Sequence, residues 1–535
     1  MNQMHKFYNF SHTVINIFWR VLFFLTLFFA LISPNIIIGD NDTFGTSTTM
    51  VTTGLVIAII VIFVMNYAYP WAHKFLYDVF ITHRILTGSL MLLVILVGQI
   101  FFVTYVHPVA GFDAGALHYA AISAENAKEP NMTAYYSLYP NNLLTTLFMH
   151  WLTEISGQTS WQFFDYVTLF LVDLSASFNL LSVYVVQRRS LGVAIYIHCA
   201  WLAVFPSIIM PYTDAWVLPF VSLFLLFYFI MRKAVTSSTI MSQVALILSS
   251  LGFGISVVLT YFVKPSAIVP VIAIVIVELL SWLIRKKHFT MRQVILTLTM
   301  LIMVGGSAGM TYMLANEKSR NQTYLKIDRS RAIPPIHFMA MGVYGEGGYD
   351  TEQAVEMSVL QTKKEKTDYS VKMLTKRLKK LGALGYLKFL VMKQRNNTAD
   401  GTFAWLKEGH FFRENQKPNN KGISNKIKNY VFLYGRHIAD FRFAAQLWWI
   451  TLLVIIALGF GPRSDLIQIL RLSLVGGFMF LLLFEGGRSR YLIQYLPCIL
   501  LLATISFERA VANIKHLFGW YEVKVDEAEA ADEKV

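Results

Sequence analysis

A carboxylate in the first long polar loop of the chain could act as a general base. Asp113 stands in the sequence HPVAGFDAGALHYAA, a few residues after an apolar run that ends near residue 106. That position would hold the carboxylate at the boundary between a lipid-borne group and water, and partial loss of water makes a carboxylate more basic. The alternative is an ordinary solvated loop aspartate.

Three cations occupy short turns directly beside other apolar runs. Lys264, Arg488 and Arg490 fall on the side of the membrane that normally receives few cations, so each needs an anionic partner. The phosphate of a lipid carrier would lie at this depth, and we expect these three side chains to bind it. An ion pair with Glu485, or contact with ordinary lipid headgroups, is the alternative.

A second acid and a polar turn accompany these residues. Asp214 in PYTDAW could orient a sugar, assist Asp113 or bind a divalent cation, the one cofactor that the sequence leaves open. It could also cap the helix that starts there. Tyr139, Asn141 and Asn142 belong to the YPNN turn, which we expect either to contact a sugar or to begin the next helix.

Further polar residues lie far from this loop. His337, Tyr349 and Glu408 are of the types that line carbohydrate sites, because aromatic rings stack on sugar faces and carboxylates accept hydroxyl hydrogen bonds. They could equally pack a small local core. Asp173 sits within an apolar run, where a carboxylate is costly, and could couple proton movement to transport or bond to a neighbouring helix.

The composition shows what must position these side chains. The chain has 535 residues, of which 55% are hydrophobic and only 15% charged, which argues against a soluble enzyme and against disorder. A spanning helix needs about 20 mainly apolar residues, and we predict an all-α polytopic membrane protein with about twelve of them. The predicted spans are 14–38, 49–69, 85–106, 163–186, 191–211, 213–231, 241–262, 265–284, 293–314, 446–460, 466–484 and 491–508.

Cations in the short loops predict the orientation. They collect on the side of the N-terminus, so that both termini are expected to be cytoplasmic and the site residues to face outward. The segment 141–157 is short for a span, and we predict an amphipathic or re-entrant helix. The predicted parts are an N-terminal pair of spans (1–84), a core (85–315) with an outer loop (107–162), an outer mixed or helical insertion (316–445), three final spans (446–509) and an acidic tail (510–535).

Most of the excess positive charge lies in the predicted outer insertion. The chain carries a net charge of +14, and residues 316–442 hold 24 Lys and Arg against 12 Asp and Glu. A basic surface beside a membrane attracts polyanions and anionic headgroups. We therefore expect an anionic envelope glycopolymer as the partner, or docking on anionic lipid, and the sequence gives no reason to expect nucleic acid.

The order and common sidedness of these motifs resemble a known superfamily. An acid in the first outer loop, a YPN turn and outer turns with an acid and a cation are similar to the GT-C glycosyltransferases, with the protein mannosyltransferases and the lipid A aminoarabinose transferase as the nearest likeness. The sequences PYTDAWVLP, KPSAIVPVIA, HFMAMGVYGEGGYD, DGTFAWLKEG and GRSRYLIQYLP also resemble a group of large integral membrane proteins of Gram-positive bacteria. The superfamily likeness covers approximately 85–315 and 485–508.

The resemblance implies an activity. It implies inverting transfer of a sugar from a polyprenyl-phosphate donor to an envelope glycopolymer, with Asp113 as the base and Lys264 and Arg490 on the leaving phosphate. Two features depart from the pattern: Ala114 stands where mannosyltransferases have a second acid, and two spans precede the loop. A transporter or flippase of lipid-linked sugars, and an envelope polymer ligase or polymerase, remain as alternatives.

Overall fold

The protein is a bundle of long helices. The computed structural model describes residues 3–43, 45–237, 239–284, 290–405, 412, 417–461, 464–484 and 486–519. No β-strand occurs in these ranges, and the only strand-like pairing there is an isolated antiparallel bridge between Ala110 and Phe412. The long helices are α1 (Gln3–Leu31), α2 (Met50–Ala68), α4 (Arg84–Tyr105), α9 (Trp161–Gln187), α10 (Leu191–Ala203), α12 (Leu218–Thr236), α13 (Ile240–Val263), α14 (Val269–Ile284), α15 (Met291–Asn321), α18 (Lys363–Thr398), α21 (Ile438–Leu458), α22 (Asp465–Leu483) and α23 (Leu496–Leu517).

Shorter helices connect the long ones. The α-helices among them are α3 (Pro70–Tyr77), α5 (Phe112–Ile122), α6 (Ala124–Ala127), α7 (Pro130–Leu138), α8 (Leu143–Ser156), α11 (Thr213–Trp216), α16 (Pro335–Met341), α17 (Thr351–Val359) and α20 (Gly422–Val431). One π-helical turn, η2 (Asp78–Thr82), leads into α4. The 3-10 turns are η1 (Pro34–Ile36), η3 (Pro140–Asn142), η4 (Arg188–Ser190), η5 (Pro206–Ile209), η6 (Pro265–Ile268), η7 (Arg329–Arg331) and η9 (Ser489–Tyr495).

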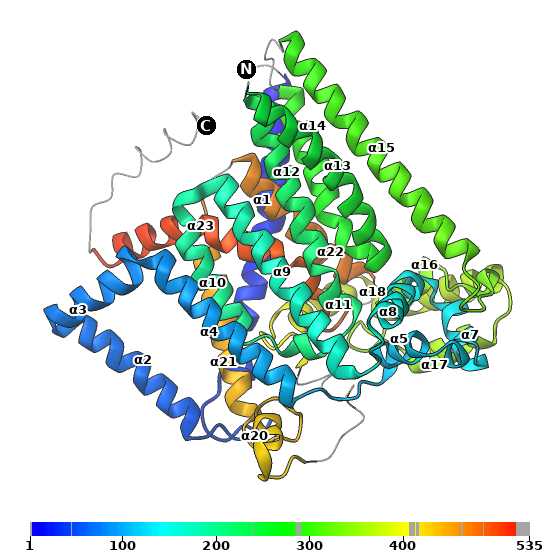
Figure 1. Ribbon diagram of the computed structural model, residues 1–535, viewed down its shortest axis with the longest axis horizontal. Coiled ribbons are helices and arrows are strands. Elements are labelled where there is room, and N and C mark those ends of the chain that lie inside the picture. The colour runs from blue at the N-terminus through cyan, green and yellow to red at the C-terminus, as the bar shows by residue number, and fades with distance from the viewer. Residues whose placement is uncertain are drawn as a thin grey trace.

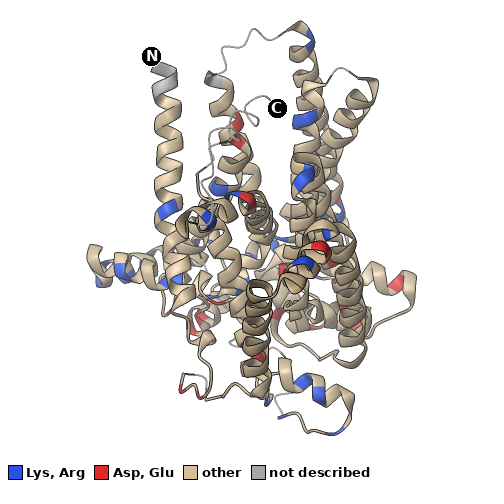
Figure 2. Cartoon of the chain, turned by 90° about the vertical axis from the view of Figure 1, so that its left-hand side faces the viewer, with Lys and Arg blue, Asp and Glu red and all other residues tan. Residues whose placement is uncertain are grey.

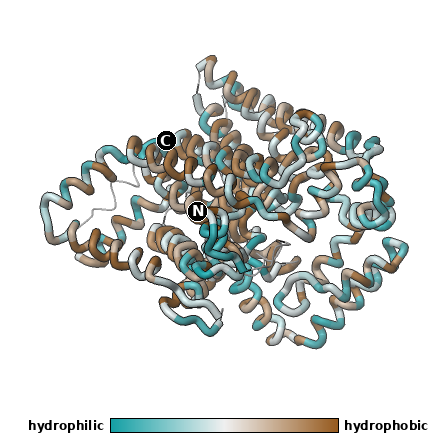
Figure 3. The backbone as a smooth tube through the Cα atoms, turned by 60° about the horizontal axis from the view of Figure 1, so that its bottom comes forward, coloured by the Kyte–Doolittle hydropathy of each residue, from teal (hydrophilic) through white to brown (hydrophobic). Residues whose placement is uncertain are grey.

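The predicted membrane class is confirmed. Within the described ranges, eleven helical stretches are long and apolar enough to cross a membrane. Each of the twelve predicted runs overlaps one of these stretches, although the run 191–211 continues past the end of its stretch. Two runs share the stretch Trp161–Ala203, because α9 and α10 follow each other closely. Figure 2 shows the long helices without charged residues over most of their length, and Figure 3 shows hydrophobic residues predominating along them.

Some helices pack in the buried centre of the bundle, and others lie exposed at its edges. α1 packs against α22, α18 and α21 in the centre, although it is the first element of the chain. α2 and α15 lie at the edges of the bundle (Figure 1), and none of the most apolar stretch of α15 is buried. Apolar surface of this kind is favourable only against lipid, so both helices are lipid-facing.

Close approach of α13 and α15 depends on one glycine. A Cβ atom at Gly254 would lie 2.6 Å from the carbonyl oxygen of Val304, so no larger residue fits without moving the helices apart. This contact holds α15 on the bundle, because α13 is its main partner. Small residues at such crossings are the usual means by which membrane helices pack closely.

Helix α18 joins the basic part of residues 316–445 to the bundle. Its first half exposes Lys372, Lys376, Lys379 and Lys380, whereas its second half packs against α1 and α22. There the buried Lys393 ammonium donates to the carbonyl oxygens of Gly342, Leu482 and Phe484. The predicted insertion is thus tied into the helical core through its own residues, while its division as a domain stays a prediction.

The segment 141–157 forms a short helix that is not among the candidate spans. α8 has 14 residues and ends at Gly157, which adopts φ 67°. A left-handed residue at this position is most readily a glycine, because it has no Cβ atom. α8 packs on α5 beside the ends of the spans, as the prediction of an amphipathic or re-entrant helix requires.

The bend in α18 provides a test of the fold. Gly382 has φ 62° and ψ 178°, a conformation nearly restricted to glycine. We expect Gly382→Ala to destabilise the protein by about 1–3 kcal/mol, although no atom lies within 4 Å of the new Cβ, because only the backbone is strained. Gly385→Ala, in a helical part of α18, should be neutral or stabilising by about 1 kcal/mol. Thermal unfolding in detergent measures both, and equal effects would contradict this account.

Candidate active site

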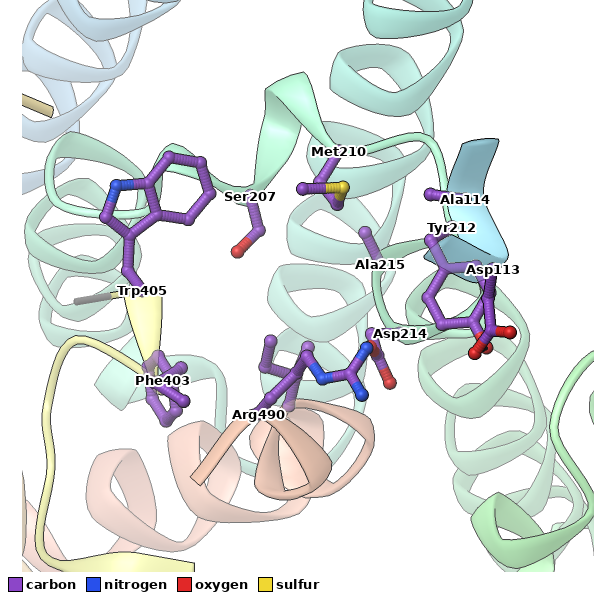
Figure 4. Close-up of a pocket in the computed structure, with 12 residues that line it drawn as sticks. Asp113, Ala114, Ser207, Met210, Tyr212, Asp214, Ala215, Phe403, Trp405 and Arg490 are labelled. Atoms are coloured by element: carbon purple, nitrogen blue, oxygen red, sulfur yellow. Dashed lines mark hydrogen bonds and ion pairs between the residues drawn. The ribbon is translucent and has the colours of Figure 1, made fainter. Parts of the chain in front are cut away.

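A pocket lies where several spans end. Its empty space, counted together with the open solvent at its mouth, is about 520 Å³, and it contains one acid from α5, one acid from α11 and one cation from η9. Its walls come from residues far apart in the chain (Figure 4): Asp113, Ala114, Ser207, Met210, Tyr212, Asp214, Ala215, Phe403, Ala404, Trp405, Arg490 and Ile493. We call this end of the bundle the site end. The fold therefore brings Asp113, Asp214 and Arg490 together in one pocket, as the sequence predicted. Their roles in catalysis and binding stay predictions.

Two tyrosines hold the carboxylate of Asp113. Tyr135 donates to one carboxylate oxygen at 2.9 Å and Tyr212 donates to the other at 3.1 Å. Burial raises the pKa of both tyrosines well above the usual range, and the charge of Asp113 raises it further. Both phenols therefore stay protonated and orient the carboxylate as donors. Asn142 in turn donates to the Tyr135 hydroxyl at 2.7 Å.

Asp214 forms an ion pair with two cations at once. One of its oxygens contacts the Lys264 ammonium, and the other lies 3.2 Å from Nη1 of Arg490. The N-cap of α11 is Tyr212, and the carboxylate of Asp214 is directed to the cations instead of capping the helix. Figure 4 shows the Arg490 guanidinium pointing toward Asp214 along the pocket wall. Arg490 lines the pocket, whereas Lys264 does not.

One short turn connects the two groups of charges. Tyr212 reaches Asp113 and Asp214 reaches the cations, from positions two residues apart. The Arg490 guanidinium also lies 5.8 Å from the centre of the Tyr212 ring and 5.0 Å from that of Tyr491, distances suited to cation–π contact. Moving this turn would therefore disturb both the carboxylate of Asp113 and the guanidinium of Arg490.

The pocket wall formed by Phe403 and Ala404 is a turn with strained backbone. Within the described ranges, non-glycine residues with positive φ occur only at Phe112, Phe403 and Ala404. The first precedes Asp113, and the other two line the pocket. Asp400 holds the turn by accepting from the backbone N–H groups of Thr402 and Ala404. Strained backbone of this kind collects at functional sites, which supports the identification of the pocket.

Sequence reasoning missed the two donors to Asp113 and the wall residue Phe403. Tyr135 and Tyr212 carry no motif that marks them as partners of an acid, and Phe403 is simply an apolar residue within DGTFAW. The only signal for Tyr212 was its position two residues before Asp214. The indole N–H of Trp405 donates to the carbonyl of Val431 at 2.6 Å, and this hydrogen bond holds the ring in one orientation at the pocket wall.

Other predicted residues lie outside the pocket. The Tyr139 ring contacts the Tyr135 ring at a tilt of 42°, with 5.5 Å between ring centres, and Asn141 donates to Asn142, so the YPNN turn supports the residues that hold Asp113. Arg488 pairs with Glu346 at 2.6 Å instead of joining the Asp214 cluster. Tyr349 is 60% exposed and does not line the pocket. Glu408 lies outside the described residues.

His337 is a packing residue in the structure. Its side chain is fully buried, and both ring nitrogens are without a hydrogen-bond partner among the described residues. Burial lowers its pKa to about 4, so the ring is neutral near pH 7. Such a side chain has no access to an acceptor in this arrangement.

A divalent cation does not fit the acids that the site brings together. Within the described ranges, no three His, Cys, Asp or Glu side chains form a group that could hold a metal ion. Asp113 accepts from two phenols, and Asp214 is bound by two cations. Both carboxylates are thus engaged by donors, and we assign no step to a metal.

Comparison with known proteins gives one match. A protein-family model described as "conserved hypothetical integral membrane protein" matches residues 7–511. The chain belongs to this family. The match runs from α1 into α23, so it includes every segment of the pocket. No curated protein and no solved structure matches the chain.

The buried ion pairs at Asp214 should matter for stability in this membrane protein. We expect Asp214→Ala to cost about 3–5 kcal/mol, because Lys264 and Arg490 then lose a shared carboxylate in a nearly buried place. The double variant Asp214→Ala/Lys264→Ala should cost less than the sum of the single variants, with a coupling of about 1–3 kcal/mol. Unfolding in detergent, followed by tryptophan fluorescence, measures these differences.

Glu346→Ala serves as the matched control for that experiment. Its carboxylate also pairs with an arginine, Arg488, but the side chain of Glu346 is 51% exposed. Exposed ion pairs contribute about 0–1 kcal/mol, so the change should be small. Additive effects of the Asp214 and Lys264 variants would contradict the shared ion pair.

The pKa of His337 predicts acid sensitivity. The unfolded chain protonates this ring near pH 6.5, whereas the folded protein resists protonation until about pH 4. Stability from this group is therefore complete above pH 6.5 and is lost as the pH falls toward 4. Between pH 7.5 and 5.5, the free energy of unfolding should fall by about 1 kcal/mol more in wild type than in His337→Phe, which has no ring to protonate. Unfolding free energies of both proteins at the two pH values measure this difference. An unchanged pH profile would show that the buried ring titrates normally.

Proposed function

We propose that this protein is a membrane glycosyltransferase. It takes a sugar from a polyprenyl-phosphate donor and transfers it, with inversion, to a hydroxyl of an envelope glycopolymer on the outer side of the membrane. The observation that carries the proposal is that Asp113 and Arg490 line one pocket at the ends of the spans. A base and a phosphate-binding cation are the two groups that such a displacement requires.

The depth of the charged residues fits a lipid-linked donor. Asp214 lies in the first turn of the stretch Thr213–Thr236, Lys264 directly follows Ile240–Val263, and Arg490 is the second residue of Ser489–Leu517. A phosphate attached to a membrane-embedded prenyl chain lies at the same level, where water is scarce and charge pairs are strong. The proposed outward orientation rests on the cations of the short loops at the other end of the spans.

The reaction would proceed as a single displacement. An oxygen of the acceptor attacks the anomeric carbon while Asp113 takes its proton, and the bond from that carbon to the phosphate oxygen breaks. The electron pair leaves with the polyprenyl phosphate, whose growing charge is stabilised by Arg490. Tyr135 and Tyr212 hold the base, and Lys264 acts as a positioning residue because it contacts Asp214 and does not line the pocket.

The nature of the walls fits a sugar. Phe403 and Trp405 provide aromatic surface on one side of the pocket, and Ser207 offers a hydroxyl. Aromatic rings pack against the C–H faces of sugars, while hydroxyl groups and carboxylates bond their edges. Because the Trp405 indole is held by Val431, its ring is ready for such a contact before substrate binds.

Asp113→Asn tests the proposal in cells whose own copy of the gene is deleted. Wild type should restore the sugar to the envelope, whereas Asp113→Asn should lower transfer by about 100–10,000-fold and let the polyprenyl-phosphate sugar accumulate. Sugar analysis of the envelope and mass spectrometry of lipid extracts measure the two effects. Asp328→Asn is the matched control, since the Asp328 carboxylate accepts from the backbone N–H and the hydroxyl of Ser330, two residues away, and Asp328 does not line the pocket.

The amount of the protein in the membrane must be equal for all variants in that experiment. Normal envelope sugar with Asp113→Asn would refute the base assignment. Failure of the deletion itself to change envelope sugars or lipid-linked donors would refute the transferase. A ligase or polymerase would instead accumulate a lipid-linked glycan, so the mass of the accumulating lipid separates these two reactions.

A transporter of lipid-linked sugars is the second candidate. It is favoured by α9, whose Asp165 is fully buried with no hydrogen-bond partner among the described residues and whose Asp173 lies beside Gln99 of α4. Carboxylates within a span often couple proton movement to transport. Transport lost in Asp173→Asn but kept in Asp113→Asn would favour this function.

A further inference from the structure

The bend of α18 carries two exposed apolar side chains. Leu384 is 84% exposed and Leu387 is 59% exposed. They are three residues apart on a helix and therefore lie on the same side of it, and the exposed Lys388 lies beside them, one turn after Leu384. Gly382, where the helix bends, directly precedes this group. A single exposed leucine is ordinary in a protein surface, whereas two together beside a cation indicate a surface that meets a partner.

Four lysines form one exposed face of α18 before the bend. They occupy positions i, i+4, i+7 and i+8, which lie on one side of a helix. They are Lys372, Lys376, Lys379 and Lys380. The opposite side packs inward, where Ser370 is buried and Arg377 pairs with Asp350 at 2.6 Å. We call these four lysines, together with Leu384, Leu387 and Lys388, the bend surface.

Acids of the protein do not balance the charge of the bend surface. Residues 369–399 contain eight Lys and Arg and no Asp or Glu, and this stretch is bounded by Asp368 and Asp400. Within the described ranges, none of the five lysines of the bend surface forms an ion pair. Glu352 and Glu356 of α17 lie near the second turn of α18, which is about 20 Å from the bend along the helix. The charge around the bend is therefore positive.

The bend surface lies close to the level at which the spans end. In the second half of α18, the Lys393 ammonium donates to the carbonyl oxygens of Leu482 and Phe484, at the end of the stretch Asp465–Leu483. Leu384 is nine residues before Lys393, which is about 14 Å along the helix. The polar layer of a bilayer adds about 5–8 Å beyond each side of its hydrocarbon core. Side chains at the bend can therefore reach the headgroups of the surrounding lipid.

We propose that the bend surface docks on the membrane and binds anionic lipid headgroups. The five lysines contact the phosphates, and Leu384 and Leu387 enter the boundary between headgroups and acyl chains. A lipid surface offers negative charge and hydrocarbon side by side. A soluble polyanion would leave the two leucines in water, and a second copy of this basic surface would be repelled. The docking does not depend on the proposed reaction, and it holds residues 316–445 against the membrane.

A fluorescent probe beside the leucines tests whether the bend enters the membrane. Cys199 and Cys498 are buried, so a thiol reagent labels an introduced surface cysteine selectively. Ala383→Cys places the probe at an exposed position next to the leucines and leaves both of them intact. In nanodiscs of phosphatidylcholine and phosphatidylglycerol, lipids with a nitroxide at the top of the acyl chain should quench this probe about twofold or more. Val359→Cys, at a 63% exposed position directly after α17, is the matched control and should stay unquenched.

The choice between two lipids tests the lysines. With the nitroxide on either phosphatidylglycerol or phosphatidylcholine, quenching of the Ala383→Cys probe gives the relative affinity of the two lipids at the bend. We expect a preference of about tenfold for phosphatidylglycerol, which Lys379→Gln/Lys380→Gln should lower to about twofold. Lys363→Gln/Lys364→Gln removes the same charge from the first turn of α18, beside Glu365 and about 24 Å away, and should change the preference less than about twofold.

Each result decides the proposal. Quenching at Ala383→Cys no stronger than at Val359→Cys overturns the docking. Quenching without a preference for phosphatidylglycerol, or an equal effect of the two lysine pairs, overturns the binding of anionic headgroups. A soluble glycerol phosphate oligomer is titrated onto the same nanodiscs. If its binding depends on Lys379 and Lys380 while the lipids do not quench the probe, the surface holds a polymer and the docking on lipid is overturned.

Discussion

The ion pairs of Asp214 are the interaction on which the site end depends. They join α11, the turn after α13 and the start of η9, three segments that are separated by 50 residues or more in the sequence. Neither cation would be stable so close to apolar helices without a counter-charge, and the carboxylate would not be stable without them. The turn that carries Asp214 also carries Tyr212, so the same interaction fixes a donor to Asp113. Position and charge of the pocket are therefore set together.

A site arranged in this way is neutral before substrate binds. Asp113 and Asp214 are balanced by Lys264 and Arg490, so the arrival of a phosphate group adds charge to a cluster that has already neutralised itself. Arg490 can contact such a group because it lines the pocket, whereas Lys264 remains on the far side of Asp214. In the proposed reaction, Lys264 keeps Asp214 paired while Arg490 interacts with the phosphate of the substrate. On this proposal the two cations have different roles, which explains why two of them accompany a single buried acid.

The sequence predicted the spans well because their signal is local. About 20 apolar residues in succession are required by the thickness of the bilayer, and each of the twelve runs overlaps a helical stretch of the structure. The sequence also predicted that Asp113, Asp214, Lys264 and Arg490 belong to one region, since alternation of the spans puts their turns at the same end. It did not predict that Asp214 would bind both cations, or that Arg488, two residues before Arg490, would turn away to Glu346. Those outcomes depend on the rotation of helices about their axes and on contacts across hundreds of residues.

Residues 316–445 show why the composition alone does not predict which charged side chains are exposed. The sequence of α18 has basic residues throughout, yet Gly382 divides it into an exposed half and a half that packs on α1 and α22. Arg377 is not a free surface charge either, because it pairs with Asp350 at 2.6 Å and donates to Gln353 at 2.8 Å. Lys393 is buried against three carbonyl groups. The net charge of the segment thus overstates the positive surface that a polyanion could meet. Exposed lysines among the described residues include those of the first half of α18 together with Lys421 and Lys426 at α20. Since a polyanion can meet only the cations that are exposed, their local arrangement, and not the total charge of the segment, determines which part of this surface attracts such a partner.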